Sequence, residues 1–211
     1  MARLKKGLFN SPEGQAGNVV FSSRNGVPYV RSRPSRYKDA KTPAQLASRA
    51  RLSMLSRLLS GLKPAINMGF RDTPPGKSSR DVAYRANSKS AIKGEWPDLY
   101  VDYPSVIVSQ GGLSPADGAS VARNGNTLVC TWTSPEKAAP YDRALLTIYD
   151  PEISSVLTEP FVAKRADEKA DFTLPGRGFG EGELHVWLAF LSPDGHRVSP
   201  SVYAGLAEAG G

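Results

Sequence analysis

A series of short apolar segments, each about the length of a β-strand, runs from Leu99 almost to the end of the chain and limits the fold more than any other feature. Strands of this length, separated by turn residues, favour a β-sandwich of the immunoglobulin or fibronectin type. Trp132 and Trp187 lie in these segments and are expected in the core, as is Cys130, the only cysteine. The expected strands are Leu99–Tyr103, Ser105–Gln110, Thr127–Thr133, Ala144–Asp150, Phe161–Arg165, Lys169–Leu174, Glu183–Ser192 and Arg197–Ala204.

The front of the chain begins with a predicted hairpin. Residues Gly17–Phe21 and Val27–Arg31 flank the dipeptide Asn25-Gly26, and Asn-Gly between apolar segments is typical of a type I′ turn. Pro28 has no amide hydrogen to donate, so the second strand is expected at a sheet edge. Because an isolated hairpin is only marginally stable, we expect it to pack on another element, such as a neighbouring subunit.

An extended basic arm, Arg31–Lys41, is predicted to follow the hairpin. Pro34 disfavours helix in the residue before it, and the arm contains scarcely an apolar side chain. Ordering a residue costs roughly 1–2 kcal/mol, which this composition does not offset. We therefore expect the arm to be mobile in the isolated protein and to become extended on a partner.

Two helices are predicted after the arm. The first should begin with Thr42 as its N-cap and Pro43 in its first turn, and should end or kink at Gly61 and Pro64. A second should start at Ser78 or Ser79 and continue through Ile92. The predicted apolar stripe of the first helix consists of Leu52, Leu55, Leu59 and Leu62.

These elements predict an α+β fold: an N-terminal β-hairpin, an extended basic arm and two helices, followed by an immunoglobulin- or fibronectin-like β-sandwich. The expected divisions are a basic anchoring region at 1–98, the sandwich at 99–206 and a flexible tail at 207–211.

Charge divides the chain at nearly the same place. Residues 1–98 carry 19 Lys and Arg against 6 Asp and Glu, or +13, whereas residues 99–211 carry 8 against 14, or −6. Three interpretations of the basic part stay open: a solvated stretch, docking onto an acidic protein surface such as another copy of the chain, and binding to nucleic acid. The candidate partner-binding residues are Arg24, Arg31, Arg33, Arg36, Lys38, Lys41, Arg49 and Arg57.

Several short motifs carry a resemblance to a known family. They include Thr42-Pro43-Ala44-Gln45, Gly94-Glu95-Trp96-Pro97-Asp98 and Leu128-Val129-Cys130-Thr131-Trp132. Together they resemble an uncharacterised family of Bacteroidetes bacteria and their phages, a domain of unknown function, and the resemblance covers nearly the whole chain. It implies no catalytic residues. The front segment is also similar to small phage proteins, which implies a component of a virion.

No motif for catalysis is evident in the sequence. It lacks a Gly-x-Ser-x-Gly elbow, a phosphate loop ending in Gly-Lys-Ser/Thr and a His-Glu-x-x-His pair, so we expect no enzyme, catalytic residue, cofactor or metal site. The absence of a long apolar run argues against a membrane partner.

The expected function is that of a structural or assembly protein of a phage-like particle, forming a homo-oligomer or lattice with itself and other particle proteins. Its expected location is the virion, or the cytoplasm of a bacterial host during assembly. The alternative is a nucleic-acid-binding protein that uses the basic arm.

Overall fold

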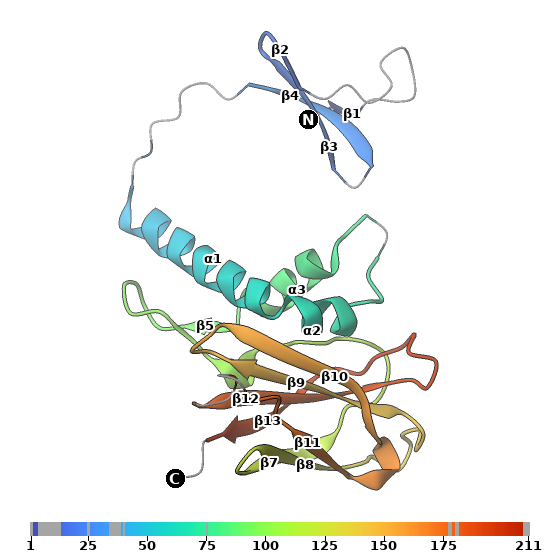
Figure 1. Ribbon diagram of the computed structural model, residues 1–211. Helices are drawn as coiled ribbons and strands as arrows, with labels where there is room; N and C mark the ends of the chain where they lie inside the picture. The colour runs from blue at the N-terminus through green and yellow to red at the C-terminus, as the bar shows by residue number, and fades with distance from the viewer. Residues whose placement is uncertain are drawn as a thin grey trace. The chain divides into compact units, whose positions relative to one another are not determined.

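The computed structural model describes residues 2–3, 14–24, 26–33, 39, 41–74, 76–176, 179 and 182–208 (Figure 1). By its internal contacts the chain divides into two compact units, Met1–Pro43 and Ala44–Gly211. The expected boundary at residue 98 follows charge and sequence pattern, whereas the contacts place the helices in the same unit as the strands that come after them.

The first unit contains one antiparallel sheet with the strand order β1-β4-β3-β2. The predicted hairpin is confirmed, because β3 pairs with β4 and Gly26 occupies the turn at a φ of 75°. The expectation that β4 is an edge strand is wrong, since β1 pairs with it at Tyr29 and Val30. This pairing stops short of Pro28, which has no amide hydrogen to contribute. The strands are β1 (Ala2–Arg3), β2 (Gly14–Ala16), β3 (Val19–Arg24) and β4 (Val27–Ser32).

The predicted arm lies largely outside the described residues. Positions 34–38 and 40 are not described, so the expected conformation of the arm stays a prediction, as do the roles of Arg36 and Lys38.

Three helices, rather than the expected two, stand among the described residues of the second unit. Helix α1 (Pro43–Gly61) begins directly after Thr42, as predicted, and Leu62 separates it from α2 (Lys63–Gly69), which has Pro64 in its first turn. Helix α3 (Ser79–Asn87) ends before the expected Ile92. Its N-cap is Ser78, whose side chain accepts a hydrogen bond from the Asp81 amide at 3.1 Å.

The strands of the second unit form two larger antiparallel sheets and one short one. The orders of the larger sheets are β10-β9-β12-β13 and β11-β8-β7, and β5 pairs with β6 in the short sheet. The strands are β5 (Ile92–Lys93), β6 (Tyr100–Val101), β7 (Asp117–Asn124), β8 (Thr127–Thr133), β9 (Arg143–Asp150), β10 (Ser155–Lys164), β11 (Lys169–Thr173), β12 (Leu184–Leu191) and β13 (Val202–Ala207). The 3₁₀ turns are η1 (Tyr103–Ser105) and η2 (Arg165–Asp167). The α+β class is thus confirmed.

The expected strand at Ser105–Gln110 is wrong. Its backbone bonds to side chains instead of a neighbouring strand: the Ile107 amide donates to the Asn87 side chain at 2.8 Å, and the Val108 amide donates to the Ser201 hydroxyl at 3.0 Å. Strand β7 was not expected, because Val121 is the only large apolar residue in its eight positions. Strands β1, β2 and β5 were not expected either, and the other differences are shifts of strand ends.

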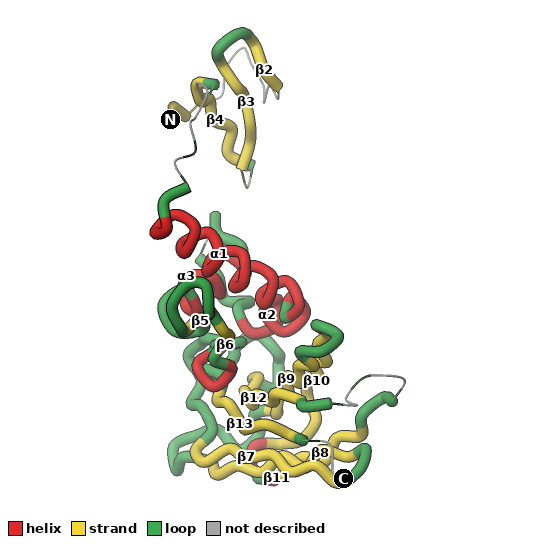
Figure 2. Tube along the Cα trace, turned by 90° about the vertical axis from the view of Figure 1, so that its left-hand side faces the viewer, coloured by secondary structure: helices red, strands yellow, loops and turns green. Residues whose placement is uncertain are grey.

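The elements of the second unit lie in three layers, with the sheet β10-β9-β12-β13 in the middle (Figures 1 and 2). One face of β9 and β12 packs on the sheet β11-β8-β7 around a core that includes Cys130, Trp132 and Phe190. Their other face contributes Tyr149 and Trp187 to a second core formed with the helices. Cys130, Trp132 and Trp187 are therefore buried as predicted, although Trp187 belongs to the helix side.

The predicted stripe of α1 is mostly confirmed. Leu55, Leu59 and Leu62 are buried, together with Leu58, whereas Leu52 is 50% exposed. Its neighbour Arg51 instead turns toward the body of the unit and donates to the backbone oxygens of Ile92, at 3.0 Å, and Gly94, at 2.5 Å.

Candidate functional site

The predicted basic residues are distributed over both units. Arg24, Arg31 and Arg33 belong to the first, with Lys41 just before its end, and Arg49 and Arg57 are exposed on α1 of the second. The described members of the predicted set are therefore divided between the two units.

The sheet of the first unit has two chemically different faces. Residues paired directly across an antiparallel ladder share a face, and alternate residues do too. One face therefore carries two arginines and a tyrosine, Arg24, Arg31 and Tyr29. The pairs on this face are Val20 with Arg31, Ser22 with Tyr29 and Arg24 with Val27. The opposite face carries Val19, Phe21, Pro28 and Val30. None of the described side chains of β2, β3 and β4 is buried.

A cluster of aromatic rings lies beneath α1 in the second unit, on the helix side of β12. His185 stacks on Tyr103 with ring centroids 3.6 Å apart and an interplanar angle of 20°, and its Nδ1 lies 2.8 Å from the Tyr203 hydroxyl. The Trp187 ring meets Tyr203 edge-on at 5.5 Å. The helix layer covers this face of the sheet, so His185 is buried.

Burial shifts the titration of this cluster. It lowers the pKa of His185 to about 4, so the imidazole is neutral at pH 7. Burial, with smaller effects from Tyr149 and Tyr203, raises the pKa of Tyr103 to about 12. Perturbed groups of this kind mark candidate sites, although buried structural groups show the same shifts.

A pocket of about 210 Å³ opens beside this cluster, between α1 and the turn that joins β9 to β10. It contains Arg57, one of the predicted site residues. Its lining residues are Met54, Arg57, Leu58, Val101, Tyr103, Tyr149, Pro151 and Ser154. A second pocket, of about 330 Å³, is lined by Phe70, Asp72, Thr73, Val82, Gln110, Gly111 and Gly112.

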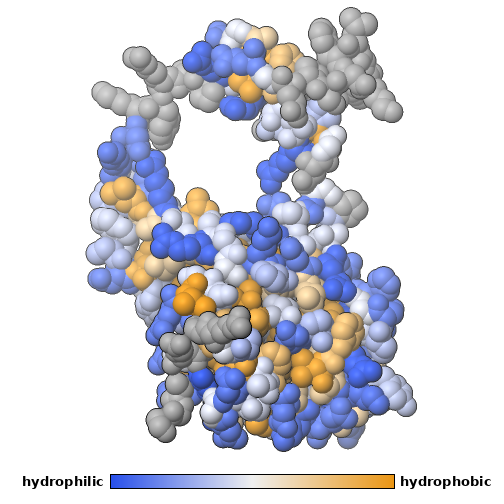
Figure 3. Space-filling model, in the orientation of Figure 1, coloured by the Kyte–Doolittle hydropathy of each residue, from blue (hydrophilic) through white to orange (hydrophobic). Residues whose placement is uncertain are grey.

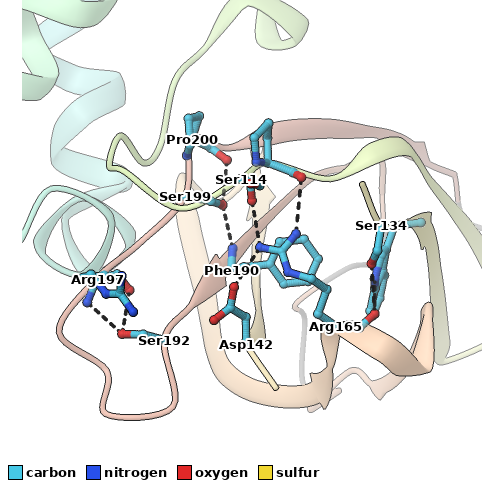
Figure 4. Close-up of polar contacts among 11 residues, drawn as sticks. Ser114, Ser134, Asp142, Arg165, Phe190, Ser192, Arg197, Ser199 and Pro200 are labelled. Carbon is cyan, nitrogen blue, oxygen red and sulfur yellow. Dashed lines mark hydrogen bonds and ion pairs between the residues drawn. The ribbon is translucent and has the colours of Figure 1, made fainter. Parts of the chain in front are cut away.

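A buried ion pair lies at the end of β9 and β10 that is away from the turn joining these two strands (Figure 4). An Nη2–Oδ2 contact of 3.1 Å joins Arg165 to Asp142, and their side chains are 0% and 3% exposed. The guanidinium also donates to the Ser114 carbonyl at 2.7 Å and stacks on the Phe190 ring at 3.6 Å. Because protein groups surround this pair and solvent does not reach it, its role is structural.

Two aspartates of the second unit serve as turn residues. Asp150 accepts hydrogen bonds from the Glu152 and Ile153 amides, and Asp167 accepts one from the Lys164 amide at 2.8 Å.

Within the described ranges, no group of three or more acidic, His or Cys side chains could hold a metal ion. None of the described helices is both long and apolar enough to cross a bilayer.

In Figure 3 hydrophilic side chains dominate the visible face, with apolar ones gathered in patches over the second unit. Its exposed large apolar residues include Leu52, Trp96, Tyr100 and Tyr141.

The chain thus combines a basic N-terminal sheet with a second unit of two facing sheets and a helix layer. It belongs to DUF6266, a family of unknown function, whose model matches residues 11–205. The sequence-based assignment to an uncharacterised family is thereby confirmed. No curated protein matches the chain.

Proposed function

We propose that the protein is a non-enzymatic structural or assembly component of a phage-like particle, anchored by its basic N-terminal unit. Its place would be the virion, or the host cytoplasm during assembly, and its partners would be further copies and other particle proteins.

The observation that carries this proposal is the two-faced sheet of the first unit. Its apolar face includes Phe21 and Val30, yet the described side chains of β2, β3 and β4 include no buried one. A small sheet gains most of its stability by packing an apolar face against something else. A sheet of this kind therefore suits docking onto a protein surface.

The distribution of charge supports the same proposal. Residues 1–43 carry 9 Lys and Arg against 2 Asp and Glu, a net charge of +7. Residues 44–211 carry the remaining 18 against 18, a net charge of zero. The first unit thus holds the whole excess charge of the molecule, which favours contact with acidic surfaces.

A fibronectin-like identity for the facing sheets is part of the proposal. In chain order, the first, second and fifth of their strands (β7, β8 and β11) face the other four. In an immunoglobulin constant domain the fourth strand lies beside the fifth, but here β10 pairs with β9. This order supports a fibronectin type III module, a common building block for protein contacts.

Sedimentation and particle purification can test the proposal. We expect the full chain to self-associate with rising concentration and to co-purify with particles. Phe21→Ser should weaken both, whereas Val20→Ser, on the opposite face of the same strand, should leave them unchanged. A chain that stays monomeric at high concentration and is absent from purified particles would exclude the proposal.

Nucleic-acid binding is a second candidate, favoured by the other face of the same sheet. Arg24, Tyr29 and Arg31 share this face, and a basic sheet with an aromatic ring can bind phosphates and stack on bases. Binding to single strands should weaken with salt, and the log–log slope should fall by about 0.7 for each phosphate that Arg24→Gln or Arg31→Gln no longer neutralises. Lys169→Gln, on β11, serves as the control. Undetectable binding at about 50 mM salt would rule this candidate out.

A further inference from the structure

The pocket beneath α1 combines apolar walls with two phenol rings. Met54 and Leu58 form the α1 side, and Val101 and Pro151 lie on the other elements around it. Tyr103 and Tyr149 have ring centroids 6.0 Å apart, and neither hydroxyl has a hydrogen-bond partner among the described residues. Two potential donors are thus available to a ligand.

The unbalanced charge of the pocket belongs to Arg57. This side chain is exposed and pairs with no described residue. Two carboxylates next to lining residues are engaged elsewhere: Asp102 pairs with Lys93 at 2.6 Å, and Asp150 accepts the Glu152 amide in its own turn. The Glu152 carboxylate lies beside Gly182. A guanidinium at the edge of an apolar pocket favours a planar anion, which it can bind with two parallel hydrogen bonds.

The walls are also held in place before any ligand arrives. Asp150, buried within β9, accepts the Glu152 amide at 3.0 Å and so fixes the turn that carries Pro151 and Ser154. Gly61 lets α1 approach this turn closely, since a Cβ there would lie 3.1 Å from the Tyr149 ring. Preorganised walls reduce the ordering cost of binding.

From these observations we propose that the pocket binds a carboxylate carried on a compact apolar or aromatic body, with Arg57 as the anion-binding residue. The carboxylate can come from a free aromatic acid or from the C-terminus of a polypeptide. This site is independent of the assembly role proposed above, because it involves neither face of the N-terminal sheet.

NMR of the full chain with ¹³C-methyl methionine can test the site. The chain has three methionines; Met54 lines the pocket, whereas Met68 packs elsewhere, near Leu145 and Ala189. Benzoate should shift the Met54 methyl signal saturably and leave Met68 unchanged, and the neutral benzamide should bind at least about tenfold more weakly. Acetyl-glycyl-phenylalanine, compared with its C-terminal amide, tests a polypeptide as the source.

Matched variants on the same helix complete the test. Arg57→Gln should weaken binding of the carboxylate probes by about tenfold or more, whereas Arg49→Gln, also exposed on α1, should bind them like the original protein. Binding of either probe supports the site. Binding of benzoate alone indicates a free aromatic acid as the source, binding of the peptide acid alone indicates a polypeptide C-terminus, and binding of both shows that the site accepts either source. Failure of both probes to shift Met54, equal binding of acid and amide forms, or full affinity in Arg57→Gln would overturn the proposal. Sedimentation of the Phe21→Ser variant tests the assembly role separately.

Discussion

At the scale of single residues, the ion pair of Arg165 and Asp142 is the most consequential buried contact. Removing the carboxylate in Asp142→Ala leaves the guanidinium buried with two backbone carbonyls and one aromatic ring for partners. We expect the free energy of unfolding to fall by about 3–5 kcal/mol, because an uncompensated buried charge is costly.

Urea denaturation measures this destabilisation against an exposed pair in the same molecule. Lys169 and Asp171 lie 3.1 Å apart with side chains 54% and 55% exposed, so Lys169→Ala should cost less than about 1 kcal/mol. Equal destabilisation in the two variants would contradict the structural role of Arg165.

His185 gives stability a defined dependence on pH. Its pKa is about 4 in the folded protein and 6.5 as the ordinary value, so the unfolded chain binds the proton more tightly. Its contribution is therefore fully present above pH 6.5 and is lost as the pH falls from 6.5 toward 4, by up to about 3 kcal/mol. Tyr103 and Tyr203, which contact the ring, stay neutral throughout this range.

The variant His185→Phe should flatten this dependence in denaturation curves recorded between pH 4 and pH 7. His196→Gln is the control, because His196 is exposed. An unchanged slope in His185→Phe would show that another group titrates with folding.

At the scale of elements, the close approach of α2 to the segment after η1 depends on Gly69. A Cβ at this position would overlap the Val108 backbone oxygen and lie 2.5 Å from the Ser109 Cβ. Gly69→Ala should therefore lower the free energy of unfolding by about 1–3 kcal/mol, the usual cost of overpacking.

A second glycine provides the matched control. A Cβ at Gly112 would meet nothing within 4 Å, so Gly112→Ala should change stability by less than about 0.5 kcal/mol. Thermal denaturation of the two variants side by side tests the prediction, and a tolerated Gly69→Ala would mean that α2 can move away from Val108.

At the scale of the whole molecule, the second unit should fold without the first. Among the residues that the structure describes, the three clusters of buried apolar side chains lie in Ala44–Gly211. The fragment 44–211 should therefore keep its melting temperature within about 2 °C of that of the full chain. It should also lose retention on a cation exchanger at pH 7, because its net charge is zero.

Calorimetry and ion-exchange chromatography of the fragment and the full chain check both expectations. A melting temperature lower by about 10 °C would mean that residues 1–43 contribute to the core of the second unit.

Local chemistry was sufficient for the elements whose signals lie within a few residues. Asn25-Gly26 predicted the hairpin, Pro43 the start of α1 and Ser78 the start of α3, and each is found where it was expected. A turn or a helix cap depends on the φ preferences and side-chain hydrogen bonds of neighbouring residues, so tertiary contacts are not needed to place it. The strand of Trp132 was likewise predicted from the sequence, because apolar and polar residues alternate around Cys130 and Trp132.

The arrangement of layers was decided by contacts between residues far apart in the chain. Strand β12 is buried along its whole length, a pattern typical of a strand covered on both faces, but periodicity alone does not reveal what covers it. The helices cover one face, and this placement buries His185 and forms the pocket around Arg57. The segment at 105–110 resembled a strand, yet Asn87 and Ser201 bind its backbone. The burial of a residue and its hydrogen-bond partner depend on the whole fold, because the partner of a buried polar group can lie anywhere in the sequence.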